Sequence, residues 1–212
     1  YLARPDAVQF GHRVYAFRER VGAMLAEKDE VDADFVMPVP DSSNYIALGY
    51  ARRSGIPLEF GLVRNHYVGR TFIKPQQSLR DEGVQEKFNP LPGVIEGKRI
   101  VLIDDSIVRG TTLRKIVRMI KGQGAKEVHV RIGSPPVTGP CPYGIDTPDK
   151  DQLIAASMTH DQITEFLCAD SLRYLDLADL RLGLKEHHRF CMACFDGRYP
   201  IPAERNSPPE SH

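Results

Sequence analysis

The stretch Lys98-Arg-Ile-Val-Leu-Ile-Asp-Asp-Ser-Ile-Val-Arg-Gly-Thr-Thr112 decides the fold of this 212-residue chain. Its apolar run from Ile100 to Ile103 ends in two acidic residues, a pattern that predicts a buried parallel strand with acid groups at its carboxyl end. A loop rich in hydroxyl groups follows, and the helical spacing of Ile116 and Ile120 predicts a helix that ends near Gly122. The predicted order is strand, acidic pair, loop and helix N-terminus.

This order has a chemical meaning. Free backbone N–H groups and the positive end of a helix dipole favour a phosphate at a helix N-terminus. Gly110 lets the backbone approach such a ligand closely. The hydroxyl donors of the loop are Ser106, Thr111 and Thr112. Asp104 and Asp105 can accept hydrogen bonds from ribose hydroxyls or act through water on Mg²⁺. The stretch therefore predicts a site for a ribose 5-phosphate at the carboxyl ends of the strands.

Two other interpretations fit parts of this stretch. A strand that ends in two aspartates also occurs in phosphorelay receivers, and Gly-Thr-Thr alone is an ordinary helix N-cap. The complete wording from Val101 to Thr112 resembles the phosphoribosyl pyrophosphate (PRPP) signature of type I phosphoribosyltransferases. It looks closest to the amidophosphoribosyltransferases, and this resemblance disfavours both alternatives.

Composition narrows the class of protein. Apolar residues make up 42% and charged residues 26% of the chain, so it can bury a core. Lys plus Arg and Asp plus Glu both number 28, which gives no whole-chain reason to expect nucleic acid or an anionic membrane as a partner. No apolar run approaches the roughly 18 residues of a membrane span, and no signal peptide is evident. A start at Tyr1 rather than Met indicates a piece of a longer protein or a processed product.

The other periodic segments alternate between strands and helices. Expected helices lie at about 11–28, 45–53, 149–156, 160–168 and 177–184, and expected strands at 34–39, 56–63, 126–133 and 172–175. This alternation predicts an α/β fold with a doubly wound, mainly parallel sheet. The polar alternation within 126–133 favours a strand nearer the sheet edge, and His129 within it is interpreted as structural.

The loop Pro40-Asp-Ser-Ser43 repeats the strand, loop, helix arrangement. Taken alone, its residue types favour a plain helix N-cap. The resemblance implies instead that Asp41, Ser42 and Ser43 bind PRPP at its pyrophosphate, and that Ser42 helps to hold Mg²⁺ together with the acidic pair.

Residues 64–92 have no clean period, few apolar residues and several cations. The cations either form a solvated face or belong to a lid that closes over pyrophosphate. The segment resembles the flexible loop of the amidophosphoribosyltransferases, which folds over PRPP. Its implied PRPP contacts are Arg70, Thr71, Gln77, Arg80 and Lys87, and the central stretch adds Arg109. Arg64 and His66 depart from the usual Lys and Arg of that family.

Four cysteines are present, and Cys168 is interpreted as a packing residue. The pair in Cys191-Met-Ala-Cys194 is too weak alone to name a metal; zinc would need two more ligands, such as Cys141 with His187 or His188. Contexts around Cys141, Cys191 and Cys194 resemble those of the branch of the family that carries a 4Fe–4S cluster. The resemblance places the fourth ligand upstream of this chain.

The resemblance covers Tyr1 to Pro200 and implies a phosphoribosyltransferase domain at 1–200 with a lid at 64–92 and a C-terminal helical appendage at 141–200. Residues 201–212 are expected to form a disordered tail. The implied enzyme is cytoplasmic, homo-oligomeric and inhibited by purine nucleotides. It displaces pyrophosphate from PRPP with ammonia, which a glutaminase domain absent from this chain supplies.

Asp104, Asp105 and Arg70 are the implied catalytic residues. Two other functions stay open at this point. One is a PRPP or nucleotide sensor without catalysis, which the intact Gly69-Arg-Thr-Phe72 motif disfavours. The other is a nucleobase transferase, which the wording of 64–92 disfavours.

Overall fold

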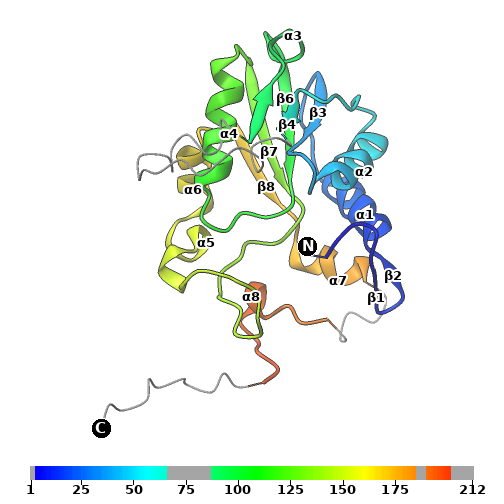
Figure 1. The fold of residues 1–212 in the computed structure, drawn as a ribbon, viewed down its shortest axis with the longest axis vertical. Coiled ribbons are helices and arrows are strands. Elements are labelled where there is room, and N and C mark those ends of the chain that lie inside the picture. Colours follow the sequence, from blue (N-terminus) through cyan, green and yellow to red (C-terminus); the bar gives the residue numbers. More distant parts are fainter. Residues whose placement is uncertain (1–2, 66–86, 185–189, 202–212) are drawn as a thin grey trace, which may run out of the picture.

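The computed structural model describes residues 3–65, 87–184 and 190–201 of the chain. Within them, a four-stranded sheet lies at the centre of the fold (Figure 1). In spatial order its strands are β3 (Phe35–Pro38), β6 (Arg99–Asp104), β7 (Glu127–Ile132) and β8 (Ser171–Tyr174). Neighbouring strands run parallel, and their registers bring the carboxyl ends of β3, β6 and β7 to one edge. An open α/β sheet binds its ligand at the carboxyl ends of its strands.

Helices cover both faces of this sheet. They are α1 (Val14–Glu27), α2 (Asn44–Ser54), α4 (Thr111–Gly122) and α6 (His160–Leu167). Val101 and Ile103 of β6 pack with α1 and α2. Ile100 and Leu102 point the other way from the same strand and pack with α4 and α6. The predicted doubly wound, mainly parallel sheet is therefore confirmed.

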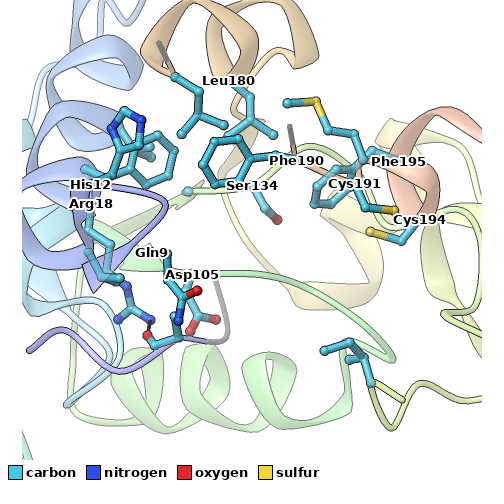
Figure 2. A pocket seen from close by; sticks show the side chains of 18 of the residues that line it. Gln9, His12, Arg18, Asp105, Ser134, Leu180, Phe190, Cys191, Cys194 and Phe195 are labelled. Atoms are coloured by element: carbon cyan, nitrogen blue, oxygen red, sulfur yellow. Dashed lines mark hydrogen bonds between the residues drawn. The ribbon is translucent and has the colours of Figure 1, made fainter. Parts of the chain in front are cut away.

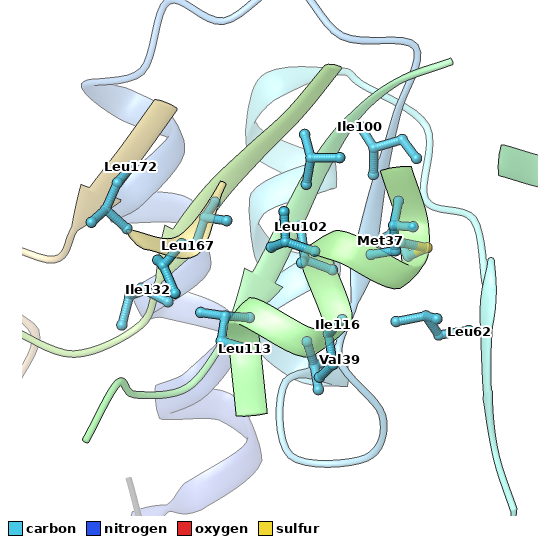
Figure 3. Packing of buried hydrophobic residues seen from close by; sticks show 14 of the residues in the cluster. Met37, Val39, Leu62, Ile100, Leu102, Leu113, Ile116, Ile132, Leu167 and Leu172 are labelled. Carbon is cyan, nitrogen blue, oxygen red and sulfur yellow. The ribbon is translucent and has the colours of Figure 1, made fainter. Parts of the chain in front are cut away.

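The larger core lies between the sheet and α4 (Figure 3). Met37 of β3, Leu102 of β6 and Ile116 of α4 are fully buried there. Burial of one such side chain contributes about 1.5–3 kcal/mol to stability. This packing fixes the first turn of α4 against the carboxyl end of β6.

On the other face, α1 and α2 touch through two glycines. A Cβ atom on Gly22 would lie 1.8 Å from the carbonyl oxygen of Ile46, and one on Gly49 would lie 1.8 Å from the carbonyl oxygen of Glu19. No residue with a side chain fits at either position without separation of the helices. The contact therefore fixes α2, and with it the loop that precedes α2.

Strand β7 lies inside the sheet, so the expectation of a strand nearer the edge was wrong: β8 takes the outer place. One polar residue of β7, Arg131, forms a buried ion pair. Arg131 donates to both carboxylate oxygens of Asp29, which follows α1, and the two side chains are 4% and 5% exposed. Tyr50 also donates to Asp29, at 2.5 Å, and Arg131 donates to Ser171 of β8 at 2.9 Å. This network replaces apolar packing on part of the face, so an alternating sequence occupies an inner strand.

His129 belongs to the same polar layer. Its Nδ1 lies 2.9 Å from Ser171 Oγ and its Nε2 lies 3.1 Å from Glu127 Oε2. These contacts agree with the structural role expected for it.

Two segments at the start of the chain differ from expectation. The helix expected from residue 11 begins only at Val14, because a short hairpin of β1 (Val8–Gln9) and β2 (His12–Arg13) precedes it. The strand expected over 56–63 is divided: a single parallel bridge joins Leu58 to Val36, and the last two residues of the range belong to a separate short strand.

A separate antiparallel pair follows this bridge. Strand β4 (Leu62–Arg64) pairs with β5 (Phe88–Pro90), and the short helix α3 (Pro92–Ile95) follows β5. The Asn65 N–H donates to the Lys87 carbonyl at 2.9 Å. The chain therefore enters and leaves segment 66–86 at one point.

The C-terminal part follows the predicted order of elements with shifted bounds. Its shorter elements are η2 (Lys150–Gln152), α5 (Ile154–Ser157), α7 (Leu177–Gly183) and α8 (Ala193–Asp196). Helix α8 was not predicted. Most of the predicted tail, 202–212, lies outside the described residues. Among the described helices, none combines the length and apolar character that a membrane crossing requires.

Candidate active site

The loop between β3 and α2 lies beside the end of β6. The Val39 N–H donates to the Ile103 carbonyl at 2.8 Å, which extends the ladder between the two strands. Beyond it, Asp41 Oδ2 lies 3.2 Å from Arg64 Nη1, and both side chains are about half exposed. The loop predicted to hold pyrophosphate thus carries a cation from β4 at its rim.

Arg18 of α1 also supports this loop and was not among the residues predicted for the site. Its guanidinium is buried and donates to the Ser42 carbonyl and, at 3.0 Å, to the Ala3 carbonyl. Arg18 and Asp105 line the same cavity. The signal that could have found it is a lone Arg on the apolar face of the helix, between Val14 and Val21.

The predicted acidic pair and hydroxyl residues form one hydrogen-bonded group. Asp104 Oδ1 accepts from the Asp105 N–H at 2.9 Å and from the Ser43 hydroxyl at 3.1 Å. Asp105 Oδ1 accepts from the Ser106 hydroxyl at 3.0 Å, and the hydroxyl oxygens of Ser42 and Ser43 lie 3.3 Å apart. The structure therefore brings together residues from both predicted loops.

Burial, and after it the charge of Asp105, raise the pKa of Asp104 to about 7. The Asp105 N–H and the Ser43 hydroxyl act in the opposite direction. Two crowded carboxylates with a hydroxyl beside them are hard oxygen donors that suit Mg²⁺, directly or through water. A cation there would relieve the repulsion between the two acids. Ser42, Asp104 and Asp105 thus fit the metal that the sequence resemblance implies.

The loop after the acidic pair ends at the N-terminus of α4. Gly110 has a φ of 74°, a backbone conformation that favours glycine, and a Cβ on it would also lie 2.8 Å from Ile154 Cδ1 and displace the end of that side chain. Thr111 and Thr112 form the exposed first turn of α4, and within the described residues their hydroxyls make no hydrogen bond. These hydroxyls and the unpaired N–H groups of the helix are available to an anion.

Arg109 binds Gln152, a residue that was not among those predicted for the site. Its Nε and Nη2 donate to Gln152 Oε1 at 3.1 and 2.9 Å. The Ile154 N–H donates to the Val108 carbonyl at 3.0 Å. Segment 150–154 therefore supports the loop from outside the strand–loop–helix unit, and no local pattern in the sequence predicts this contact.

Four of the residues expected in the lid lie outside the described residues. They are Arg70, Thr71, Gln77 and Arg80. Lys87 is described and stands exposed at the turn before β5. Their contacts with a ligand stay predictions.

Three cysteines line an apolar cavity of about 490 Å³, and Figure 2 shows two of them, Cys191 and Cys194, together at one end. Cys191 and Cys194 flank the start of α8, and Cys141 comes from the turn-rich segment that follows β7. Arg18 and Asp105 lie at the other end of the cavity (Figure 2). The cavity thus connects the cysteine group with the acidic pair.

Burial, and after it negative charge on Cys141 and Cys191, raise the pKa of Cys194 to about 11. Three neighbouring thiols are soft ligands of the kind that iron–sulfur clusters use, but they are one short of a four-cysteine set. Within the described residues, no three His, Cys, Asp or Glu side chains are arranged to hold a single metal ion. Cys168 ends α6 and packs against the core on the α4 side, as expected for a packing residue.

Comparison with known proteins identifies the family. Residues 14–132, which include β3, β6, β7 and both loops of the site, match the model of the phosphoribosyl transferase domain. The chain belongs to the phosphoribosyltransferase domain family.

Several relatives within this family match nearly all of the chain. It is 54% identical over 95% of its length to the amidophosphoribosyltransferase of Synechocystis, and 50% identical over its full length to the chloroplastic enzyme of Vigna aconitifolia. These matches span 41% and 44% of the relatives, so the chain has less than half of their length.

A solved structure shares the fold of this phosphoribosyltransferase domain. The glutamine PRPP amidotransferase of Bacillus subtilis, complexed with ADP and GMP, superposes with a TM-score of 0.88 and 47% identity. The match covers 98% of this chain and 47% of that one. The type I phosphoribosyltransferase fold expected from the sequence is therefore confirmed.

Proposed function

We propose that this chain is the phosphoribosyltransferase half of an amidophosphoribosyltransferase. In this reaction the nitrogen of ammonia bonds to C1 of PRPP as the bond from C1 to pyrophosphate breaks, and the nitrogen then loses a proton. The product is 5-phosphoribosylamine, at the first step of de novo purine nucleotide synthesis. The observation that carries the proposal is the hydrogen-bonded group that joins Ser43, Asp104 and Asp105 beside the open N-terminus of α4.

Each part of the site has a role in this proposal. The first turn of α4, with Ser106, Gly110, Thr111 and Thr112, holds the 5-phosphate through N–H and hydroxyl donors. Asp104 and Asp105 accept hydrogen bonds from the ribose hydroxyls, and their negative charge favours the positive charge that develops at C1.

The leaving group takes away negative charge, so cations at the loop after β3 favour its departure. Ser42, Asp104 and Asp105 are the proposed ligands of Mg²⁺, which when bound neutralises charge on pyrophosphate. Arg64, held at the loop rim by Asp41, adds a cation. We assign further contacts over the pyrophosphate to Arg70, Thr71, Gln77, Arg80 and Lys87.

The remaining functions of the longer relatives are also part of the proposal. A glutaminase in the portion that this chain does not span would supply ammonia. Purine nucleotides would inhibit, which the ADP and GMP bound by the Bacillus subtilis protein support. Cys141, Cys191 and Cys194 would supply three ligands of a 4Fe–4S cluster, and the fourth would come from upstream; their shared cavity supports this assignment.

The test is pyrophosphate release from PRPP with Mg²⁺ and ammonium, measured for this chain and for Asp104→Asn/Asp105→Asn. We expect release that depends on ammonium and falls by at least about 100-fold in the double variant, the scale on which one charge-stabilising group acts. Gln123→Ala, at a partly exposed position directly after α4, serves as the control and should leave the rate unchanged.

Other outcomes would point to the other functions. Tight PRPP binding without release would indicate a sensor. Release that needs a purine base instead of ammonium would indicate a nucleobase transferase and would refute the proposal.

A further inference from the structure

Ser43 occupies the N-cap position of α2, but its hydroxyl does not cap the helix. A serine at this position normally accepts a hydrogen bond from an N–H in the first helical turn. In this chain the hydroxyl instead donates to Asp104 Oδ1, at 3.1 Å, across the gap between two loops. Ser43 therefore does not cap α2, as its sequence position predicts, but forms a hydrogen bond to a residue of the candidate active site.

The Ser43 hydroxyl is out of reach of a substrate. The residue is 0% exposed, and its N–H and carbonyl are used by Val39 and Ala47. A hydroxyl has one proton to donate, and that proton points to Asp104. Any effect of Ser43 on the reaction therefore acts through the groups that its hydroxyl contacts, Asp104 and, at 3.3 Å, the Ser42 hydroxyl, and not through direct contact with PRPP.

The two oxygens of Asp104 are unequal. Oδ1 accepts from both the Ser43 hydroxyl and the Asp105 N–H, whereas within the described residues Oδ2 accepts from no donor. Two donors on one oxygen fix the plane of the carboxylate, because rotation would break both bonds. Oδ2 is then the oxygen that remains for a ligand.

We infer that Ser43 is a positioning residue, which holds Asp104 through Oδ1 so that Oδ2 faces Mg²⁺ and the ribose of PRPP. The inference rests on the proposed function and changes one expectation within it. Ser42 remains one of the residues proposed to contact the ligand, whereas Ser43 is now proposed to contact Asp104 and not the ligand.

The test compares Ser43→Ala with Ser54→Ala, a matched control. Ser54 ends the same helix, and its hydroxyl donates to the Tyr50 carbonyl, far from the acidic pair in sequence. We expect Ser43→Ala to lower kcat for PRPP at least 10-fold and to raise the Mg²⁺ concentration for half-maximal rate several-fold. Ser54→Ala should change neither. Ser43→Thr, which keeps the hydroxyl, should recover most of the loss, and Ser43→Gly serves if the alanine variant does not fold.

Combining the changes separates positioning from general damage. In the Asp104→Asn background, Ser43→Ala should cost less than twofold further, because the group it orients has been altered. Full additivity of the two losses, or unchanged Mg²⁺ dependence in Ser43→Ala, would overturn the inference.

Calorimetric binding of PRPP with Mg²⁺ distinguishes failure of this inference from failure of the proposed function. If the unaltered chain binds but releases no pyrophosphate, the proposed reaction fails while Ser43→Ala must still weaken binding for the inference to stand. If the unaltered chain neither binds nor reacts, both are overturned.

Discussion

Replacement of Arg131 by methionine should lower the free energy of unfolding by about 3–5 kcal/mol, because it leaves the buried carboxylate of Asp29 without its cationic partner. Asp29 is only 5% exposed, and among the described residues it would keep the Tyr50 hydroxyl as its remaining side-chain donor. The same change removes the guanidinium hydrogen bonds to the Val130 carbonyl and the Ser171 hydroxyl. A domain has about 5–15 kcal/mol of stability in total, so the variant should lie near the limit of folding.

Urea denaturation monitored by circular dichroism measures this loss, with calorimetry as the check on two-state behaviour. Arg53→Met is the control, since Arg53 pairs with Glu27 at an exposed position where both side chains are about half accessible. An exposed pair contributes about 0–1 kcal/mol, so this variant should change little.

The double variant Asp29→Asn/Arg131→Met removes both charges. It should be more stable than the sum of the two single losses predicts, because neither partner is left as a bare buried charge. A loss below about 1 kcal/mol in Arg131→Met, or strict additivity in the double variant, would refute the reasoning.

Two further predictions concern the packing of α1 and α2 and a carboxylate beside β8. Gly49→Ala should lower stability by about 1–3 kcal/mol or more despite the better helix propensity of alanine, since its Cβ would lie 1.8 Å from the Glu19 carbonyl oxygen; Gly122→Ala, where a Cβ meets nothing within 4 Å, should be neutral or stabilising in the same thermal melt. Burial raises the pKa of Asp170, but the Val128 N–H and the Lys121 ammonium together lower it below its usual value. The contribution of Asp170 should therefore be complete above about pH 4 and disappear as the pH falls through the lowered pKa. Unfolding curves of Asp170→Asn and the parent should converge at low pH, and a gap that stayed constant with pH would contradict this assignment.

The site residues that the sequence revealed are those that lie close together along the chain. Asp104, Ser106 and Thr112 belong to one strand, loop and helix, so local periodicity places them correctly before any tertiary contact is known. The same holds for Ser42, which follows β3 in a unit of the same kind.

The residues that the sequence analysis missed act across long separations. Arg18 reaches the Ser42 carbonyl from α1, and Gln152 reaches Arg109 from η2. Nothing in the sequence around Arg18 or Gln152 indicates the residue that it binds. The misplacement of β7 has a related cause: alternation is normally a sign of solvent on one face, whereas the polar residue Arg131 meets a buried acid.

Other expectations depend on groups beyond the described residues. The contacts of Arg70, Thr71, Gln77 and Arg80 and the completion of a cluster on the three cysteines stay predictions. Oligomeric state and purine nucleotide inhibition likewise stay predictions.

The position of β8 has a consequence for how the chain is made. Residues 14–132 carry both loops of the site, but β7 at the end of this region pairs on its outer side with residues 171–174. While the ribosome synthesises the intervening segment, β7 presents an open edge with Arg131 beside it, and such edges recruit other strands. Between the emergence of residues 132 and 174, the outer edge of β7 therefore lacks its native partner and can pair with other strands. We expect a chaperone that covers strand edges to act during this interval.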